Sequence, residues 1–254
     1  MNHARLGLMT ALLVTQLAAA PPAYLHAQPS TPTPSAVGAV LDDKSRARGE
    51  VMFSFERPGL QVPRYHLEIS ENGLGSYGGE ELPFSVDNSD TPPSPLPFDS
   101  KRFYVSPGTV TKIYALARSL NQFTIPCASM AKNIADTGKK TLIYIHLPDV
   151  RNSCTYNYTD NKDVQAITGI FQNIAETLDE GRKLDYLHRY DRLGLDAELV
   201  SFSREVADGH AIELQTIAET LSSLAGDPEV MQRVRTRASA LLTLVPTQSH
   251  QTEQ

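Results

Sequence analysis

The chain has 254 residues, a formal net charge of −6 and 41% hydrophobic residues, with two cysteines and no tryptophan. This length allows one large domain or two small ones, and the ordinary composition excludes a chain that is disordered throughout. The acidic balance argues against nucleic acid as a partner, because nucleic-acid-binding proteins concentrate positive charge. Two cysteines are too few for a disulfide scaffold or for a zinc site made of cysteines alone.

The N-terminus has the pattern of a secretory signal peptide, predicted to span residues 1–27. A basic residue precedes an apolar run over residues 6–20, which is shorter than the roughly 20 residues of a membrane-spanning helix. We expect cleavage after Ala27, with Ala20 as the alternative site and an uncleaved membrane tether as the alternative interpretation. The protein is therefore expected to reach the periplasm or the medium, without stable membrane insertion after cleavage. Residues 28–49 are rich in Pro, Ser and Thr and are expected to form a flexible leader.

Strand patterns follow the leader. Apolar and polar residues alternate over residues 51–55 and again over 65–69, so each segment is predicted to bury one face. Glu71-Asn72-Gly73 predicts a hairpin turn, because Asn and Gly tolerate positive φ. The returning strand is expected over residues 74–77, closed by Gly78-Gly79.

The next segment combines a proline-rich stretch with a helix signal. Residues 83–99 contain five prolines and are predicted to form a long surface loop. Residues 103–105 are a short strand or the entry to a helix. Ser106 is expected as the N-cap and Pro107 as the first residue of an amphipathic helix that extends to Leu120.

A central strand is predicted over residues 139–147, because both of its faces are partly apolar. Pro148-Asp149 is expected to turn the chain into a strand over residues 154–158. A wide apolar stripe then predicts a helix over residues 161–181, ending at Gly181. Shorter helices are predicted over residues 183–190, 195–207, 210–225 and 228–244, the last capped by Asp227.

Strands precede helices in blocks, which predicts an α+β fold with a small antiparallel sheet, packed helices and a helical C-terminal region. The expected organisation is an α+β domain over residues 50–182, a helical region packed on it over 183–246, and a disordered tail over 247–254. The sequence contains no internal repeat with the period of a solenoid protein.

Several short motifs resemble those of an exported bacterial domain family of unknown function. They are the hairpin YHLEISENGLGSYGG (65–79), the helix over 106–123, the strand start at 140–142, and the segments 191–198 and 235–242. The resemblance covers roughly residues 50–245. It implies export and, because the family has no assigned activity, it implies no catalytic residue.

Export changes how the two cysteines are interpreted. An oxidising compartment permits Cys127 and Cys154 to form a disulfide, which is our expectation. The alternative is a catalytic thiol partnered by His146 or His188.

The densest polar cluster surrounds His188. On a helix, Asp185, His188 and Asp191 lie on one side at three-residue spacing, where a histidine between carboxylates can act as a general base or bind a metal. The alternative is a set of exposed ion pairs with Arg189 and Arg192 that contributes about 0–1 kcal/mol per pair.

Two Asp-rich segments could offer oxygen ligands to calcium, residues 160–163 and 87–90. Neither has the spacing of an EF-hand loop. The alternatives are a helix N-cap at Asp160 or Asn161 and a turn at the second segment. We expect no metal and no cofactor.

Tyr144, His146, Tyr156 and Tyr158 lie on two adjacent predicted strands and are the best candidates for a binding surface for protein, peptide or glycan. The alternative is that the tyrosines pack beneath the helices.

The sequence contains no nucleotide-binding loop, nucleophile elbow or zinc-protease motif. We therefore expect a non-catalytic binding or interaction module. The alternatives are a periplasmic hydrolase, with His146 and a carboxylate from the helical part meeting only in the fold, and a structural envelope protein.

Overall fold

The computed structural model describes residues 49–84, 93–146 and 150–246. The predicted signal peptide, leader residues 28–48, the tail over 247–254, the turn at Pro148-Asp149 and the acidic segment 87–90 lie outside these residues. Within the described ranges, no helix has both the length and the apolar character needed to cross a bilayer.

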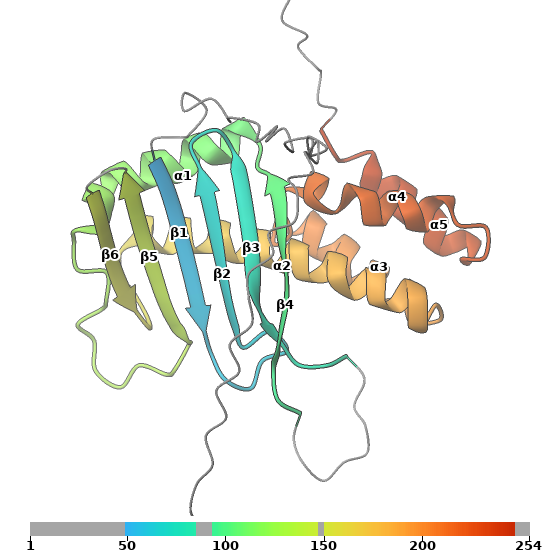
Figure 1. Cartoon of the computed structure of the whole chain (residues 1–254), viewed down its shortest axis with the longest axis horizontal. Helices are drawn as coiled ribbons and strands as arrows, with labels where there is room; N and C mark the ends of the chain where they lie inside the picture. Colours follow the sequence, from blue (N-terminus) through green and yellow to red (C-terminus); the bar gives the residue numbers. More distant parts are fainter. Residues whose placement is uncertain (1–48, 85–92, 147–149, 247–254) are drawn as a thin grey trace, which may run out of the picture. The chain divides into compact units, whose positions relative to one another are not determined.

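A six-stranded antiparallel sheet forms the first half of the fold, as the sequence predicts (Figure 1). Its strand order is β4-β3-β2-β1-β5-β6, so the predicted central strand β5 has neighbours on both sides. The strands are β1 (Gly49–Glu56), β2 (Arg64–Ser70), β3 (Leu74–Glu81), β4 (Leu96–Tyr104), β5 (Lys139–His146) and β6 (Val150–Tyr156).

The register of the sheet follows from the alternating apolar residues. Phe53 of β1 is fully buried and pairs with Leu67 of β2 on one side and Leu142 of β5 on the other. A shift by one residue would expose this whole set of side chains, so burial of one face determines the pairing. The alternation predicted over 51–55 and 65–69 is confirmed.

Two glycines shape this part of the sheet: Gly73 allows the turn between β2 and β3, and Gly79 allows β3 to continue alongside β2. Gly73 has a φ of +85°, as the predicted hairpin turn requires. The prediction that β3 ends at Gly78-Gly79 is wrong, because the strand continues to Glu81. A Cβ on Gly79 would lie 2.4 Å from the carbonyl oxygen of Arg64, so the glycine permits a close approach of two backbones inside the sheet.

Part of the loop predicted over residues 83–99 forms a strand instead. Strand β4 begins at Leu96 and includes Pro97, which lies opposite Glu80 of β3. Proline is tolerated there because β4 is at the edge of the sheet, where one side of the strand needs no hydrogen-bond partner.

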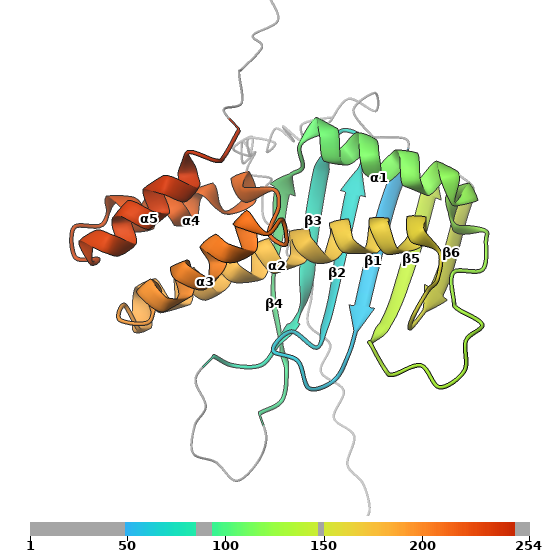
Figure 2. The same cartoon turned by 180° about the vertical axis from the view of Figure 1, so that it is seen from behind.

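Two helices cover one face of the sheet, α1 (Pro107–Ser119) and α2 (Lys162–Tyr190) (Figure 2). Both begin at the predicted caps: the side chain of Ser106 accepts from the N–H of Thr109, and Asn161 caps α2. The main hydrophobic core lies between these helices and the sheet.

The predicted end of α2 at Gly181 is wrong, since the helix continues for nine more residues. A Cβ on Gly181 would lie 2.4 Å from Cγ2 of Ile217, so this glycine makes room for a neighbouring segment rather than breaking the helix. A second hydrophobic cluster begins at Leu184. It includes residues of α3 (Leu195–Ala207), the 3₁₀ turn η3 (Leu214–Ile217), α4 (Ala218–Gly226) and α5 (Gln232–Leu242).

The capping role predicted for Asp227 is not found, because α5 begins only at Gln232. The Asp227 carboxylate instead accepts the N–H of Glu229 in the preceding turn. The helix predicted over 210–225 is shorter than expected and starts as the η3 turn.

Glu213 connects the C-terminal helices to the start of α1. It adopts a left-handed backbone with φ of +60°. Its carboxylate accepts from the N–H and the hydroxyl of Ser106, both at 2.7 Å, and from the hydroxyl of Thr109 at 2.5 Å. A negative charge at a helix N-terminus is favourable, so Glu213 joins the two parts of the fold electrostatically.

Cys127 and Cys154 form the predicted disulfide, with their Cα atoms 5.8 Å apart. Both residues are buried, and the bond connects the segment after α1 to β6. The alternative of a catalytic thiol is therefore wrong for both cysteines.

Replacement of Gly181 by alanine should lower the free energy of unfolding by about 1–3 kcal/mol, because the added methyl group overpacks against Ile217. Gly169→Ala is the matched control in the same helix. Its Cβ would meet no atom within 4 Å, so this change should stabilise by up to about 1 kcal/mol. Urea denaturation of both variants measures the difference. Equal effects of the two substitutions would contradict the close packing at Gly181.

The disulfide should stabilise the fold by about 3.5 kcal/mol, given the 27-residue separation of its cysteines. The double variant Cys127→Ser/Cys154→Ser should lose this amount in guanidinium denaturation. Thiol titration of the unreduced, unfolded protein should find no reactive thiol. Two reactive thiols would mean that the bond is absent from the protein in solution.

Candidate functional site

The tyrosines predicted as a binding surface do not share one exposed face. Tyr144 and Tyr156 are 6% and 4% exposed and lie on the helix-covered face of the sheet. The hydroxyl of Tyr156 hydrogen-bonds to that of Thr168 on α2. Only Tyr158, beyond the end of β6, is exposed. For Tyr144 and Tyr156 the alternative of packing beneath the helices is therefore the correct one.

His146 lies at the end of β5 and is half-buried. Its Nδ1 is buried, with no hydrogen-bond partner among the residues that the structure describes. The pairing of His146 with a carboxylate from the helical part, on which the predicted hydrolase depended, is not among the described hydrogen bonds.

His188 is paired with a different carboxylate from the two that the sequence suggested. Its Nε2 lies 2.8 Å from Oδ2 of Asp227, and this hydrogen bond lowers the pKa of Asp227. Asp185 accepts from Thr220, and Asp191 accepts from the N–H of Gly194. The hydrogen bond between His188 and Asp227 connects the end of α2 to the turn before α5, and its role is therefore structural.

The acidic segment 160–163 serves the start of α2. Asn161 accepts from the N–H groups of Asp163 and Val164, while Asp160 and Asp163 accept from Ser129 and Ser119. The N-cap alternative is therefore correct for Asn161. Across the described ranges, no group of three or more His, Cys, Asp or Glu side chains is arranged to hold a metal ion.

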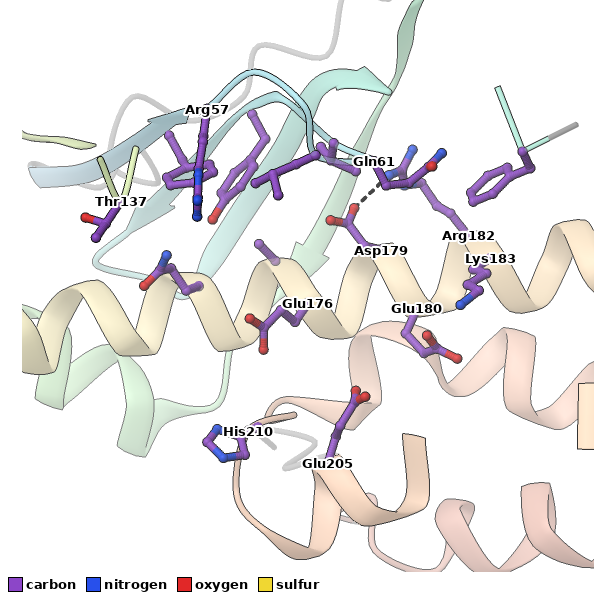
Figure 3. Close-up of a pocket in the computed structure, with 17 residues that line it drawn as sticks. Arg57, Gln61, Thr137, Glu176, Asp179, Glu180, Arg182, Lys183, Glu205 and His210 are labelled. Carbon is purple, nitrogen blue, oxygen red and sulfur yellow. Dashed lines mark hydrogen bonds and ion pairs between the residues drawn. The ribbon is translucent and has the colours of Figure 1, made fainter. Parts of the chain in front are cut away.

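A pocket of about 720 Å³ lies where the loop after β1 meets α2 and the end of α3, and we call it the central pocket (Figure 3). Its apolar and aromatic part comes from Phe55, Leu60, Val62, Tyr65, Phe84 and Ala175. Its polar part comes from Arg57, Gln61, Thr137, Gln172, Glu176, Asp179, Glu180, Arg182, Lys183, Glu205 and His210.

One side of the central pocket is a tightly paired group. Asp179 accepts from the hydroxyl of Tyr77 at 2.6 Å and from Arg182 at 2.7 Å. Arg182 also pairs with Glu81 at 2.7 Å and lies 3.7 Å from the ring centroid of Phe98. Burial raises the pKa of Asp179, and Arg182 and Tyr77 oppose that shift. These contacts hold Asp179 and Arg182 in fixed positions between the sheet and α2.

The other side gathers carboxylates with fewer partners. Glu176 and Glu180 extend from α2 toward Glu205 and His210, which belong to the end of α3 and the segment after it (Figure 3). One oxygen of Glu180 is buried, with no hydrogen-bond partner in the described part of the chain. The adjacent Lys183 pairs with Glu198 of α3 at 2.6 Å.

Burial, followed by the nearby charge of Glu198, raises the pKa of Glu180 to about 8. Burial and Glu205 also raise the pKa of Glu176, although solvent screens this more exposed group. The raised pKa favours the protonated form of Glu180 at neutral pH. The central pocket thus offers donors, acceptors and an aromatic wall to a ligand.

Sequence reasoning missed this pocket. The charged run from Glu176 to Lys183 interrupts the apolar pattern of α2, and this interruption is the one sequence feature that could have indicated a polar site on the helix. The loop over 57–62 and residues 205–210 are distant from it in sequence, and only the tertiary fold brings them to the same cavity.

The shifted pKa of Glu180 should make stability depend on pH. Its pKa is raised from an ordinary value of 4.5, so the folded state binds the proton more tightly than the unfolded state does. The free energy of unfolding should therefore fall as the pH rises from about 4.5 to about 8.

Glu180→Gln removes the titrating group and should reduce this fall, raising stability above pH 8 by several kcal/mol. Urea denaturation across this pH range measures the effect. Glu219→Gln, at an exposed position on α4, is the control and should retain the original pH dependence. An unchanged pH dependence in Glu180→Gln would show that this carboxyl group titrates normally.

No protein-family model matches the chain, and no curated protein matches its sequence. The resemblance to an exported bacterial family therefore stays an expectation. Function has to be inferred from the geometry of the central pocket.

Proposed function

We propose that this protein is a non-catalytic binding module and that its ligand occupies the central pocket. The pocket itself is the observation that carries the proposal. Its volume of about 720 Å³ falls within the range of about 300–1,000 Å³ that is typical of ligand sites. Its lining combines an apolar wall with converging polar groups, which are the two kinds of contact that such sites use.

The lining favours a polar ligand that donates hydrogen bonds. The side chains of Arg182 and Lys183 already pair with carboxylates, which leaves the carboxyl groups of Glu176 and Glu205 as acceptors in the lining, where Arg57 is a further cation. Carboxylate oxygens accept hydrogen bonds, so hydroxyl or ammonium groups on a ligand would complement them. Phe55 and Tyr65 offer the apolar contact that orients such a ligand.

Export is part of the proposal. Two observations support it: the signal-peptide pattern in residues 1–27 and the disulfide between Cys127 and Cys154. Disulfides persist in oxidising compartments such as the periplasm and the extracellular medium. The partners we propose are accordingly exported proteins, peptides or glycans.

A hydrolase is the second candidate, and Glu180 is the observation that favours it. A carboxyl group with a pKa of about 8 near a second carboxyl group, that of Glu205, resembles the pairs in which one group acts as general acid and the other as general base. This candidate differs from the hydrolase expected from the sequence, because His146 does not line the pocket.

A thermal-denaturation screen of the purified chain against small neutral and cationic polar compounds tests binding. We expect a compound to stabilise the folded state, by about 2.7 kcal/mol at a concentration of 100 times its Kd. Glu176→Lys should abolish the stabilisation, since it reverses a charge at the pocket. Glu219→Lys, outside the pocket, should preserve it.

Analysis of the recovered compound separates the two candidates. An unchanged compound supports a binding module. A cleaved compound, with cleavage lost in Glu180→Gln, would establish the hydrolase instead. Stabilisation that persists in Glu176→Lys would place the ligand elsewhere and refute the proposed site.

A further inference from the structure

A row of three aromatic rings leads from the central pocket along α2. Phe84 lines the pocket and packs against Tyr186, with ring centroids 4.9 Å apart. Tyr186 packs in turn against Tyr190, at 5.0 Å. We call these three residues the aromatic row.

The aromatic row is continuous with the pocket because of helix periodicity. Asp179, Lys183, Tyr186 and Tyr190 are separated by four, three and four positions and therefore lie along one face of α2. The first two line the pocket, and the last two belong to the row. A ligand that leaves the pocket along α2 would therefore meet the tyrosines next.

The outer end of the row is open to solvent. Tyr190 is 72% exposed, and Leu193, which follows α2 closely in sequence, is 81% exposed. Isolated exposed apolar residues are ordinary on protein surfaces. Aromatic rings that pack on one another and extend from a ligand-sized cavity are a more specific feature, because such contacts restrict the side-chain rotamers before a ligand arrives.

The chemistry of the two parts together points to a carbohydrate. Sugar rings present an apolar face of C–H groups, which packs on aromatic rings, and a rim of hydroxyl groups, which donate and accept hydrogen bonds. The pocket lining supplies acceptors at Glu176 and Glu205, and the guanidinium group of Arg57 supplies donors. Both signs of charge occur in the lining, which suits a neutral ligand better than a strongly charged one.

A proline-rich peptide also packs on aromatic side chains, but it fits the pocket less well. Proline has no N–H to donate, so such a peptide offers fewer donors to the pocket carboxylates. A sugar can offer a hydroxyl to each of them. We therefore propose that the ligand is a neutral oligosaccharide, with one end in the central pocket and the following units along the aromatic row. This inference rests on the proposed binding function.

Isothermal titration calorimetry with two neutral series tests the inference: β-1,4-linked glucose and β-1,4-linked N-acetylglucosamine, each from mono- to hexasaccharide. Affinity for at least one series should rise with chain length, by about 2- to 10-fold for the contact with Tyr190. Tyr190→Ala should remove that gain and leave the affinity for the shortest binding sugar unchanged. Tyr104→Ala is the matched control, because Tyr104 is 61% exposed on β4 and lies outside both the pocket and the row.

The outcomes separate this inference from the proposed function. If small polar compounds bind in the pocket but neither series gains affinity with length, the oligosaccharide inference is wrong and the binding module stands. If no compound of either kind binds, both are wrong. Equal losses in Tyr190→Ala and Tyr104→Ala, or binding of a proline-rich peptide in place of the sugars, would also overturn the inference.

Discussion

The burial of one continuous face of α2 is the constraint on which the rest of this structure depends. Over its first part, as far as Leu178, the helix buries apolar residues in the core that it shares with the sheet and α1. From Leu184 onward the same helix contributes to the cluster formed with α3, α4 and α5. Gly181 lies between these parts and admits Ile217 against the helix backbone. The sheet and the C-terminal helices are thus positioned by a single rigid element.

The junction between the two hydrophobic clusters explains why charged groups gather there. The side of α2 that lines the central pocket near Gly181 faces neither core fully, and Glu176, Asp179, Glu180 and Arg182 lie on it. Asp179 and Glu180 are nonetheless largely buried, and burial raises the pKa of both carboxyl groups. Asp179 is compensated by Tyr77 and Arg182, whereas Glu180 keeps a buried oxygen without a described partner. Full compensation suits a structural role, and incomplete compensation suits a site that receives a ligand.

The sequence predicted local features well because their causes are local. Alternation in β1 and β2, the turn at Gly73, and the caps at Ser106 and Asn161 depend on residues that are adjacent in the chain. The α+β class follows from the order of these elements. The disulfide needed one further premise, export, because two cysteines alone do not determine whether they pair.

The sequence by itself therefore determined the class, most strands and helix starts, and the identity of the cysteine pair. The tertiary structure alone decided which face of β5 is buried, and with it the fate of Tyr144, since both faces of that strand carry apolar residues. It also decided that α2 passes through Gly181 and that Pro97 lies in an edge strand. The central pocket belongs to this second group, because Glu176, Glu205 and the loop over 57–62 meet only through long-range packing. Periodicity reports how a segment folds, but the neighbours that a side chain meets depend on contacts far along the chain.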